Sequence, residues 1–149
     1  MTTLPPPPPL EQPAPSPYGT GLVPYATWAQ RAAGWLVDAV PSIILNVIGR
    51  AAGGGVSLVC GLLGLLYFAL NICYWQGKTG QSIGKRLVGI KLIKEETGQP
   101  VGGWFSFGRQ IVHILDALPI LLGYLWPLWD RKKQTFADKI LSTVVVSAK

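Results

Sequence analysis

Two long apolar segments dominate the hydropathy pattern of the first half of the chain. The first runs from about residue 28 to 48, and the second, from 56 to 75, contains no charged residue. A helix of about 20 apolar residues crosses a bilayer, so each segment is long enough to span a membrane. The glycine-rich stretch 49–55 between them predicts a short turn, and Pro41 favours a kink in the first helix. The pattern therefore predicts an α-helical integral membrane protein with two antiparallel transmembrane helices.

A third hydrophobic segment, from about residue 104 to 129, has a mixed pattern. Its first half places polar residues at spacings of three and four, which aligns them on one face of a helix suited to the membrane interface. These residues are Ser106, Arg109, Gln110, His113 and Asp116. The second half, ALPILLGYLWPLW, is too short to span a bilayer alone, and Pro119 marks the break between the halves.

Two topologies are compatible with this third segment. A re-entrant or interfacial hairpin keeps the basic residues before and after it, within 78–94 and 131–139, on one side of the membrane. A third span bent at Pro119 places them on opposite sides. Because Lys and Arg concentrate in cytoplasmic loops, we favour the hairpin and expect the N-terminus in the cytoplasm.

The polar segment between the second and third apolar segments predicts a small cytoplasmic β-structure. Residues 90–92 alternate like a short strand, and residues 95–98 resemble a hairpin turn. The stretch ILSTVVVSAK near the C-terminus is β-branched from Thr143 to Val146, so we expect a hairpin or small sheet that pairs it with the first strand. The basic side chains of the polar segment are expected to attract anionic lipid headgroups, and they are Lys78, Lys85, Arg86, Lys91 and Lys94.

Residues 1–25 form a proline-rich tail, and residues 26–149 form the expected membrane domain. Five consecutive prolines favour an extended polyproline II conformation, and the tail has too few apolar residues to build a core. The tail is either a disordered extension or a docking strand laid across a partner. It lacks the basic and apolar regions of a secretory signal peptide.

The composition supports membrane insertion and narrows the functional classes. Of the 149 residues, 49% are hydrophobic and 13% are charged, against about 25% charged residues in soluble domains. The net charge of +6 is interpreted first as an orientation signal, so we expect no nucleic-acid partner. Cys60 and Cys73 would lie about 20 Å apart on one helix, which excludes a disulfide between them. With His113 they are too few for a zinc site, so we expect no metal and no cofactor.

No catalytic motif is evident. The sequence GQSIGKR resembles a phosphate-binding loop, but it has three residues instead of four before Gly-Lys, and Arg86 stands where a magnesium-binding Ser or Thr is required. No Ser-His-Asp or Cys-His arrangement can be argued. We therefore expect a protein that is not an enzyme.

Arg31 and Asp38 are charged residues within the first apolar segment. An ionisable residue costs about 2.5–3.5 kcal/mol in the hydrocarbon, so Asp38 is expected to face protein. The two residues share a helix face but lie about 10 Å apart along the axis, too far for direct contact without help from long side chains. Arg109 and His113 are candidate partners of Asp38. The contact is either an ion pair or hydrogen bond that fixes helix packing, or a site that binds a proton or cation.

Two further sites follow from position and spacing. Asp138 lies at the membrane edge, where we expect it to pair with a base of the loop 80–94 and hold two basic segments together. Ser57, Gly61 and Gly64 place small residues near one face of the second helix, and such a face lets another helix approach closely.

Three motifs resemble, in the correct order, the RDD family of bacterial integral membrane proteins. They are QRAAGWLVDAV at 30–40, GQSIGKRLVGIKLI at 80–93 and QTFADKILSTVVV at 134–146. The resemblance assigns Arg31, Asp38 and Asp138 to family motifs and implies a multi-pass protein of the bacterial plasma membrane. The proline-rich tail is similar to that of actinobacterial members.

The closing motif departs from the family pattern. Ala137 replaces a His, Leu141 and Ser142 replace Ala-Gly, and His113 stands where many members have a basic residue. These departures weaken any ion-transport role of those positions. Transport of unknown ligands is suggested for the family, and cation/proton antiport is attributed to some members.

Two functions are therefore considered. The first is a non-catalytic accessory or assembly subunit that packs against a larger membrane complex, such as a respiratory or transport complex, through its helix faces and tail. The second is a component of a cation/proton antiporter that acts as a homo-oligomer, with Asp38 exchanging a proton for a cation. We favour the first because two spans leave little interior for a transport path.

Overall fold

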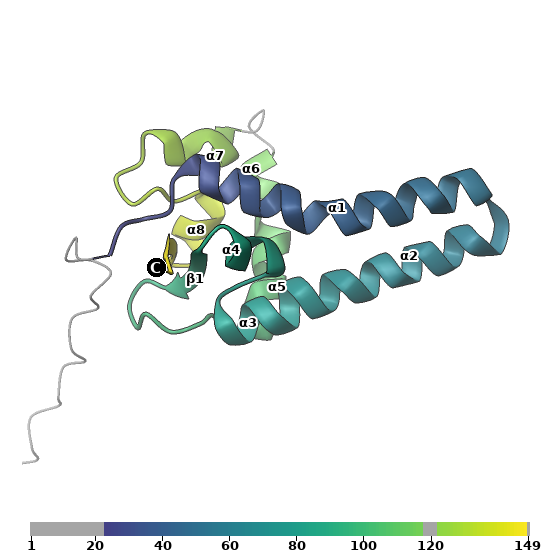
Figure 1. Ribbon diagram of the computed structural model, residues 1–149. Helices are drawn as coiled ribbons and strands as arrows, with labels where there is room; N and C mark the ends of the chain where they lie inside the picture. The colour runs from purple at the N-terminus through teal and green to yellow at the C-terminus, as the bar shows by residue number, and fades with distance from the viewer. Residues whose placement is uncertain (1–22, 118–121, 149) are drawn as a thin grey trace, which may run out of the picture.

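The computed structural model describes residues 23–117 and 122–148. Figure 1 shows a long antiparallel hairpin that projects from a compact group of short elements. In chain order the elements are α1 (Trp28–Ala52), α2 (Gly54–Phe68), the π-helical segment η2 (Ala69–Trp75), α3 (Gln76–Thr79), α4 (Ile83–Leu87), β1 (Ile90–Lys94), α5 (Gly103–Val112), α6 (Ile114–Ala117), α7 (Leu122–Leu125), the 3-10 turn η3 (Trp126–Leu128), α8 (Phe136–Ile140) and β2 (Thr143–Ser147).

The hairpin consists of α1 and of a second helix in which α2, η2 and α3 follow one another. Thr27 starts α1 through a capping box, in which its side chain accepts from the backbone of Gln30 and the Gln30 side chain accepts from the backbone of Thr27. Gly53, with φ of 66°, ends α1 and allows the reversal into α2. Both helices, Trp28–Ala52 and Gly54–Thr79, are long and apolar enough to cross a membrane, as predicted.

The helices extend beyond the predicted boundaries. The predicted turn over 49–55 is mostly wrong, because α1 continues to Ala52 and the reversal needs little more than Gly53. Pro41 lies inside α1, where helical structure continues on both sides of it. We call residues 39–70 the projecting part of the hairpin, and residues 23–38 and 71–148, as far as they are described, the base.

The base contains the predicted sheet. β1 pairs antiparallel with β2 from Ile90 opposite Ser147 to Lys94 opposite Thr143, and Tyr25 bridges Val146 on the other edge of β2. The sheet is confirmed, but it is not a hairpin. The turn at 95–98 leads on toward α5 instead of β2, and the two strands come from distant parts of the chain. Apolar clusters form its core, with Ala26, Ile90, Leu92, Val101 and Val145 in one and Ile93, Val144 and Val146 in the other.

The third hydrophobic segment forms short elements. Among the described residues, α5, α6, α7 and η3 are each too short to span a bilayer, and the predicted break at Pro119 lies outside the described residues. In Figure 1, α5 runs across the foot of the hairpin instead of along it. Of the predicted proline-rich tail 1–25, the described residues are Val23 to Tyr25, and they join the base.

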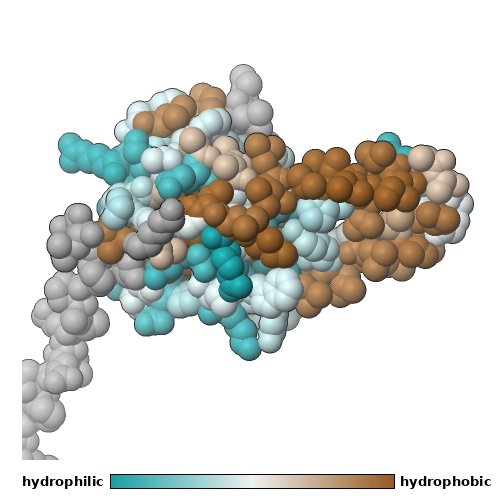
Figure 2. Space-filling model, viewed as in Figure 1, coloured by the Kyte–Doolittle hydropathy of each residue, from teal (hydrophilic) through white to brown (hydrophobic). Residues whose placement is uncertain are grey.

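The surface differs sharply between the two parts. Figure 2 shows an almost continuous hydrophobic surface over the projecting part and a mixed surface over the base. Leu58 and Leu65 are 67% and 64% exposed. In α5 the pattern is inverted relative to a soluble protein, because Trp104 is 89% exposed while Ser106 and Arg109 are buried.

Candidate functional site

Asp138 is a buried carboxylate that joins three elements of the base. Its Oδ2 accepts a hydrogen bond from Arg31 Nη1 of α1 at 2.6 Å. Its Oδ1 accepts from Arg109 of α5, at 2.5 Å from Nη2 and 3.1 Å from Nε, and from Thr143 Oγ1 of β2 at 3.2 Å. Thr135 fixes the position of this carboxylate, because the two residues form the capping box that begins α8.

The charge state of Asp138 follows from these contacts. Burial opposes its ionisation, but the charges of Arg109 and Arg31, with their hydrogen bonds, outweigh that effect and hold its pKa well below the usual range. Asp138 is therefore a stable anion that neutralises two arginines. The expected partner in the loop 80–94 is wrong, because the arginines come from α1 and α5.

Asp38 lies in a separate network that docks α4 onto the hairpin. Its Oδ1 accepts from Asn71 Nδ2 and from the backbone N–H of Gly84, both at 2.8 Å, and its Oδ2 accepts from Ser82 Oγ at 2.5 Å. Asn71 in turn accepts from the N–H of Ile83 at 2.8 Å. Arg109 and His113 were the candidate partners of Asp38, and that assignment is wrong, because they pair with Asp138 and Asp116.

A close backbone contact accompanies this network. A Cβ atom on Gly84 would lie 2.0 Å from the carbonyl oxygen of Gly34 in α1, so no side chain fits at this position. The glycine therefore lets α4 approach α1 closely enough for its N–H groups to reach Asp38.

His113 and Asp116 form a third pair, in the segment that follows α5. Their Nδ1 and Oδ2 atoms are 2.5 Å apart, and the other carboxylate oxygen of Asp116 accepts from the N–H of Ala137 at 3.2 Å. Burial is the main cause that lowers the pKa of His113, so the ring is neutral at pH 7 and donates from Nδ1. The ring stacks on Tyr124, whose carbonyl accepts from Trp28 Nε1 of α1 at 3.0 Å.

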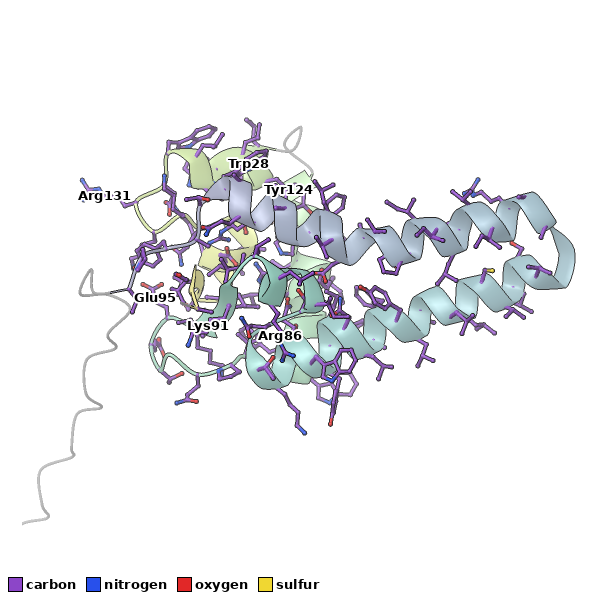
Figure 3. All side chains as sticks on the ribbon, viewed as in Figure 1. Trp28, Arg86, Lys91, Glu95, Tyr124 and Arg131 are labelled. Atoms are coloured by element: carbon purple, nitrogen blue, oxygen red, sulfur yellow. The ribbon has the colours of Figure 1, made fainter. Side chains whose placement is uncertain are left out.

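The five basic residues of the polar segment have different environments. Lys85 is partly buried near Arg109, and its pKa is lowered to about 8 by burial and then by the charge of Arg109. Lys78 lies over the ring of Tyr74, and Lys94 lies over that of Phe105. Figure 3 shows that Arg86, Lys91 and Arg131 all lie on the base.

The small residues of the second helix divide into two groups. Ser57 packs near Gly49 of α1, where a Cβ atom on Gly49 would lie 3.3 Å from the Cα of Ser57. Gly61 and Gly64 have no atom within 4 Å of an added Cβ. Their side of the helix is therefore open in this chain.

Several network residues were not predicted from the sequence. Asn71, Gln76, Ser82 and Thr143 are buried and hydrogen-bonded within the base. The sequence does contain a signal for Asn71, which is a lone amide near the end of an uncharged apolar run. An amide in hydrocarbon requires a hydrogen-bond partner, so a buried contact could have been expected there. Among the described residues, no group of three or more His, Cys, Asp or Glu side chains is arranged to hold a metal ion.

These features define a small, mainly helical protein with two candidate membrane spans and a base held together by buried ion pairs. The profile of the RDD family matches residues 25–142, so the chain belongs to the RDD family, as the three motifs indicated. The RDD family is a membrane family, which together with the two candidate spans supports a membrane protein.

Relatives include mycobacterial proteins described as proline-rich antigens. The chain is 49% identical over 83 residues to the proline-rich antigen homolog of Mycobacterium tuberculosis, which is 56% of this chain and 35% of that protein. The proline-rich antigen of Mycobacterium leprae has the same identity over 83 residues, with 33% of its length covered. The chain thus spans about a third of the length of these relatives.

A more distant relative is covered over most of its length. An uncharacterized protein of Haemophilus influenzae is 29% identical over 124 residues, which is 79% of this chain and 77% of that protein. No solved structure matches the chain. These comparisons support an actinobacterial type of RDD protein.

Proposed function

We propose that α1 and the second helix cross the bacterial plasma membrane and that α5 lies in its cytoplasmic interface. The inverted polarity of α5 supports this placement. Its polar side, with Ser106 and Arg109, faces protein, while apolar side chains are exposed where lipid would cover them. Arg50 is the one basic residue between Arg31 and Lys78, so most basic residues lie at the base. Lys and Arg concentrate on the cytoplasmic side of membrane proteins. This distribution favours a cytoplasmic location for the base and for the N-terminal segment.

In this placement the protein serves as a non-catalytic accessory subunit of a larger membrane complex, for example a respiratory or transport complex. One observation carries the proposal. The buried polar side chains hold segments of the base together, whereas the projecting part exposes apolar side chains and an open face at Gly61 and Gly64. An open face of small residues suits a close-packed partner helix. The proline-rich tail, of which residues 1–22 lie outside the described residues, would provide a second contact as an extended docking strand.

Affinity purification of the tagged full chain in a mild detergent tests the proposal. We expect a membrane protein to co-purify in a fixed ratio. Gly64→Leu should reduce its recovery, because the new side chain fills the open face. Gly108→Leu is the matched control, since Gly108 in α5 also has open space around it. Recovery of the homomeric chain alone would refute the accessory role.

The antiporter alternative depends on a proton-exchanging Asp38. Both oxygens of this carboxylate already accept hydrogen bonds, including one from a backbone N–H, which supports a structural role. Proteoliposomes with a pH gradient provide the test. Sodium or potassium flux that disappears in Asp38→Asn, with the fold intact, would favour the antiporter over the accessory subunit.

A further inference from the structure

Arg50, on the projecting part of the hairpin, has no counter-ion among the described residues. The sequence has no acidic residue from Ala39 to Lys94. In the described part of the chain, no carboxylate forms an ion pair with Arg50. A guanidinium beside apolar surface is costly unless it reaches water or an anion. The projecting part of the hairpin therefore presents a single cation to its surroundings.

The depth of Arg50 matches a lipid phosphate. Nineteen residues separate Arg31 from Arg50 in the continuous helix α1. At a rise of 1.5 Å per residue this is about 28 Å, close to the hydrocarbon thickness of a bilayer. Arg31 lies within the base, where it pairs with Asp138, and the base is the end placed at the cytoplasmic interface. Arg50, at the other end of α1, therefore lies near the phosphates of the opposite leaflet.

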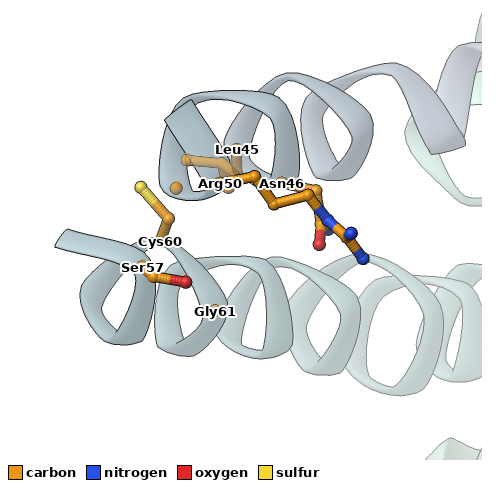
Figure 4. A pocket seen from close by; sticks show the side chains of 7 residues that line it. Leu45, Asn46, Arg50, Ser57, Cys60 and Gly61 are labelled. Atoms are coloured by element: carbon orange, nitrogen blue, oxygen red, sulfur yellow. The ribbon is translucent and has the colours of Figure 1, made fainter. Parts of the chain in front are cut away.

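Two hollows in the surface meet at Arg50 and Asn46. The first, of about 220 Å³, lies between α1 and α2 and is also lined by Leu45, Gly49, Ser57, Cys60 and Gly61. The second, of about 390 Å³, follows the outer side of α1 and is also lined by Trp35, Ala39, Ser42, Ile43 and Val47. In Figure 4 the Arg50 side chain extends along the hairpin beside Asn46, away from Ser57 and Cys60.

We propose that these hollows bind one anionic glycerophospholipid of the leaflet at the hairpin turn. Its phosphate pairs with Arg50, and an acyl chain lies along the apolar outer side of α1. Asn46 donates its amide to the carbonyl of Ser42, which leaves its side-chain oxygen to accept from a headgroup hydroxyl. The absence of acidic residues in this stretch disfavours choline and ethanolamine headgroups, because their ammonium finds no carboxylate. This inference depends on the proposed membrane placement. With lipid in the hollow at Gly61, the proposed partner helix would pack at Gly64.

Native mass spectrometry of the full chain, with dioleoyl phosphatidylglycerol or dioleoyl phosphatidylcholine added, tests the lipid site. The wild-type protein should retain one phosphatidylglycerol molecule in preference to phosphatidylcholine. Arg50→Gln should weaken that binding about tenfold, the value of one lost charge-assisted contact. Gly61→Leu should weaken it too, because it fills the first hollow and keeps the charge. Arg86→Gln removes the same charge from the base and should leave the binding within about twofold.

Four results would overturn this lipid site. An equal loss of phosphatidylglycerol binding in Arg50→Gln and Arg86→Gln would indicate that the net charge of the protein attracts the lipid without a defined site. Equal retention of the two lipids would remove the headgroup preference. A transmembrane helix of a partner cross-linked at position 50 would mean that protein fills the hollows. Failure of the wild type to float with phosphatidylglycerol liposomes would refute the membrane placement as well, whereas flotation without lipid preference would refute the lipid site alone.

Discussion

The base buries polar side chains, whereas the projecting part of the hairpin exposes apolar ones. Asn71, Gln76 and Asp138 are fully buried in the base, and each is hydrogen-bonded. On the projecting part, Leu58 and Leu65 are exposed over about two thirds of their surface. Directional hydrogen bonds and ion pairs thus fix the shape of the base from within. The projecting part takes its stability from what surrounds it, which in this proposal is lipid and a partner.

The largest expected effect is the loss of the central anion of the base. Asp138→Asn leaves Arg109 and Arg31 without a counter-charge, and Arg31 Nε and Nη2 are already buried without a hydrogen-bond partner in the described residues. Breaking a buried ion pair typically costs about 3–5 kcal/mol. Thermal and denaturant unfolding in detergent measures this cost. Glu96→Gln is the control, because it removes an exposed acid from the same part of the molecule. Equal stability of the two variants would contradict the central role of Asp138.

The same substitution should have opposite effects in the two regions. Gly84→Ala forces a methyl group against the backbone of Gly34 and should destabilise the base by about 1–3 kcal/mol. Gly64→Ala meets no atom within 4 Å and should be neutral or stabilise the helix by up to about 1 kcal/mol. Unfolding curves for both variants in one detergent provide the comparison. A Gly84→Ala variant as stable as Gly64→Ala would show that the close contact is dispensable.

Lys85 should give the base a distinct response to alkaline pH. Its pKa is about 8 in the folded protein and higher in the unfolded chain, so the unfolded chain binds more protons between these values. The stability of the wild type should therefore rise relative to Lys85→Gln as the pH increases from about 8 to 10.5. Parallel curves for the two proteins across this range would indicate that Lys85 is hydrated like an ordinary surface lysine.

The smallest effect is expected at the exposed ion pair between Lys132 and Glu95. The Lys132 side chain is half exposed, so solvent screens the interaction. Lys132→Gln should change the free energy of unfolding by less than about 1 kcal/mol. A loss as large as that of Asp138→Asn would mean that surface pairs contribute to the base as much as buried ones do.

Elements that depend on a continuous run of neighbouring residues could be predicted from the sequence. Long apolar runs predicted the two helices that are long and apolar enough to cross a membrane, and β-branched composition predicted the sheet. The sequence was not sufficient for the contacts of Asp138, because Arg31 and Arg109 are 107 and 29 residues away and meet it only through tertiary folding. The spacing of Arg31 and Asp38 correctly excluded direct contact. The spacing could not reveal that Asp38 accepts hydrogen bonds from Ser82 and Gly84 at the start of the short helix α4. That helix has no strong periodicity in the sequence by which it could have been predicted.

The position of Asp138 along the chain has a consequence for biosynthesis. The ribosome adds Arg31 and Arg109 to the chain before it adds Asp138. Both arginines therefore lack their shared counter-ion until α8 has been synthesised. In the proposed membrane placement the hairpin can insert before the ion pairs of the base form. A nascent chain that stops before α8 therefore carries two arginines that lack the counter-ion of the complete base.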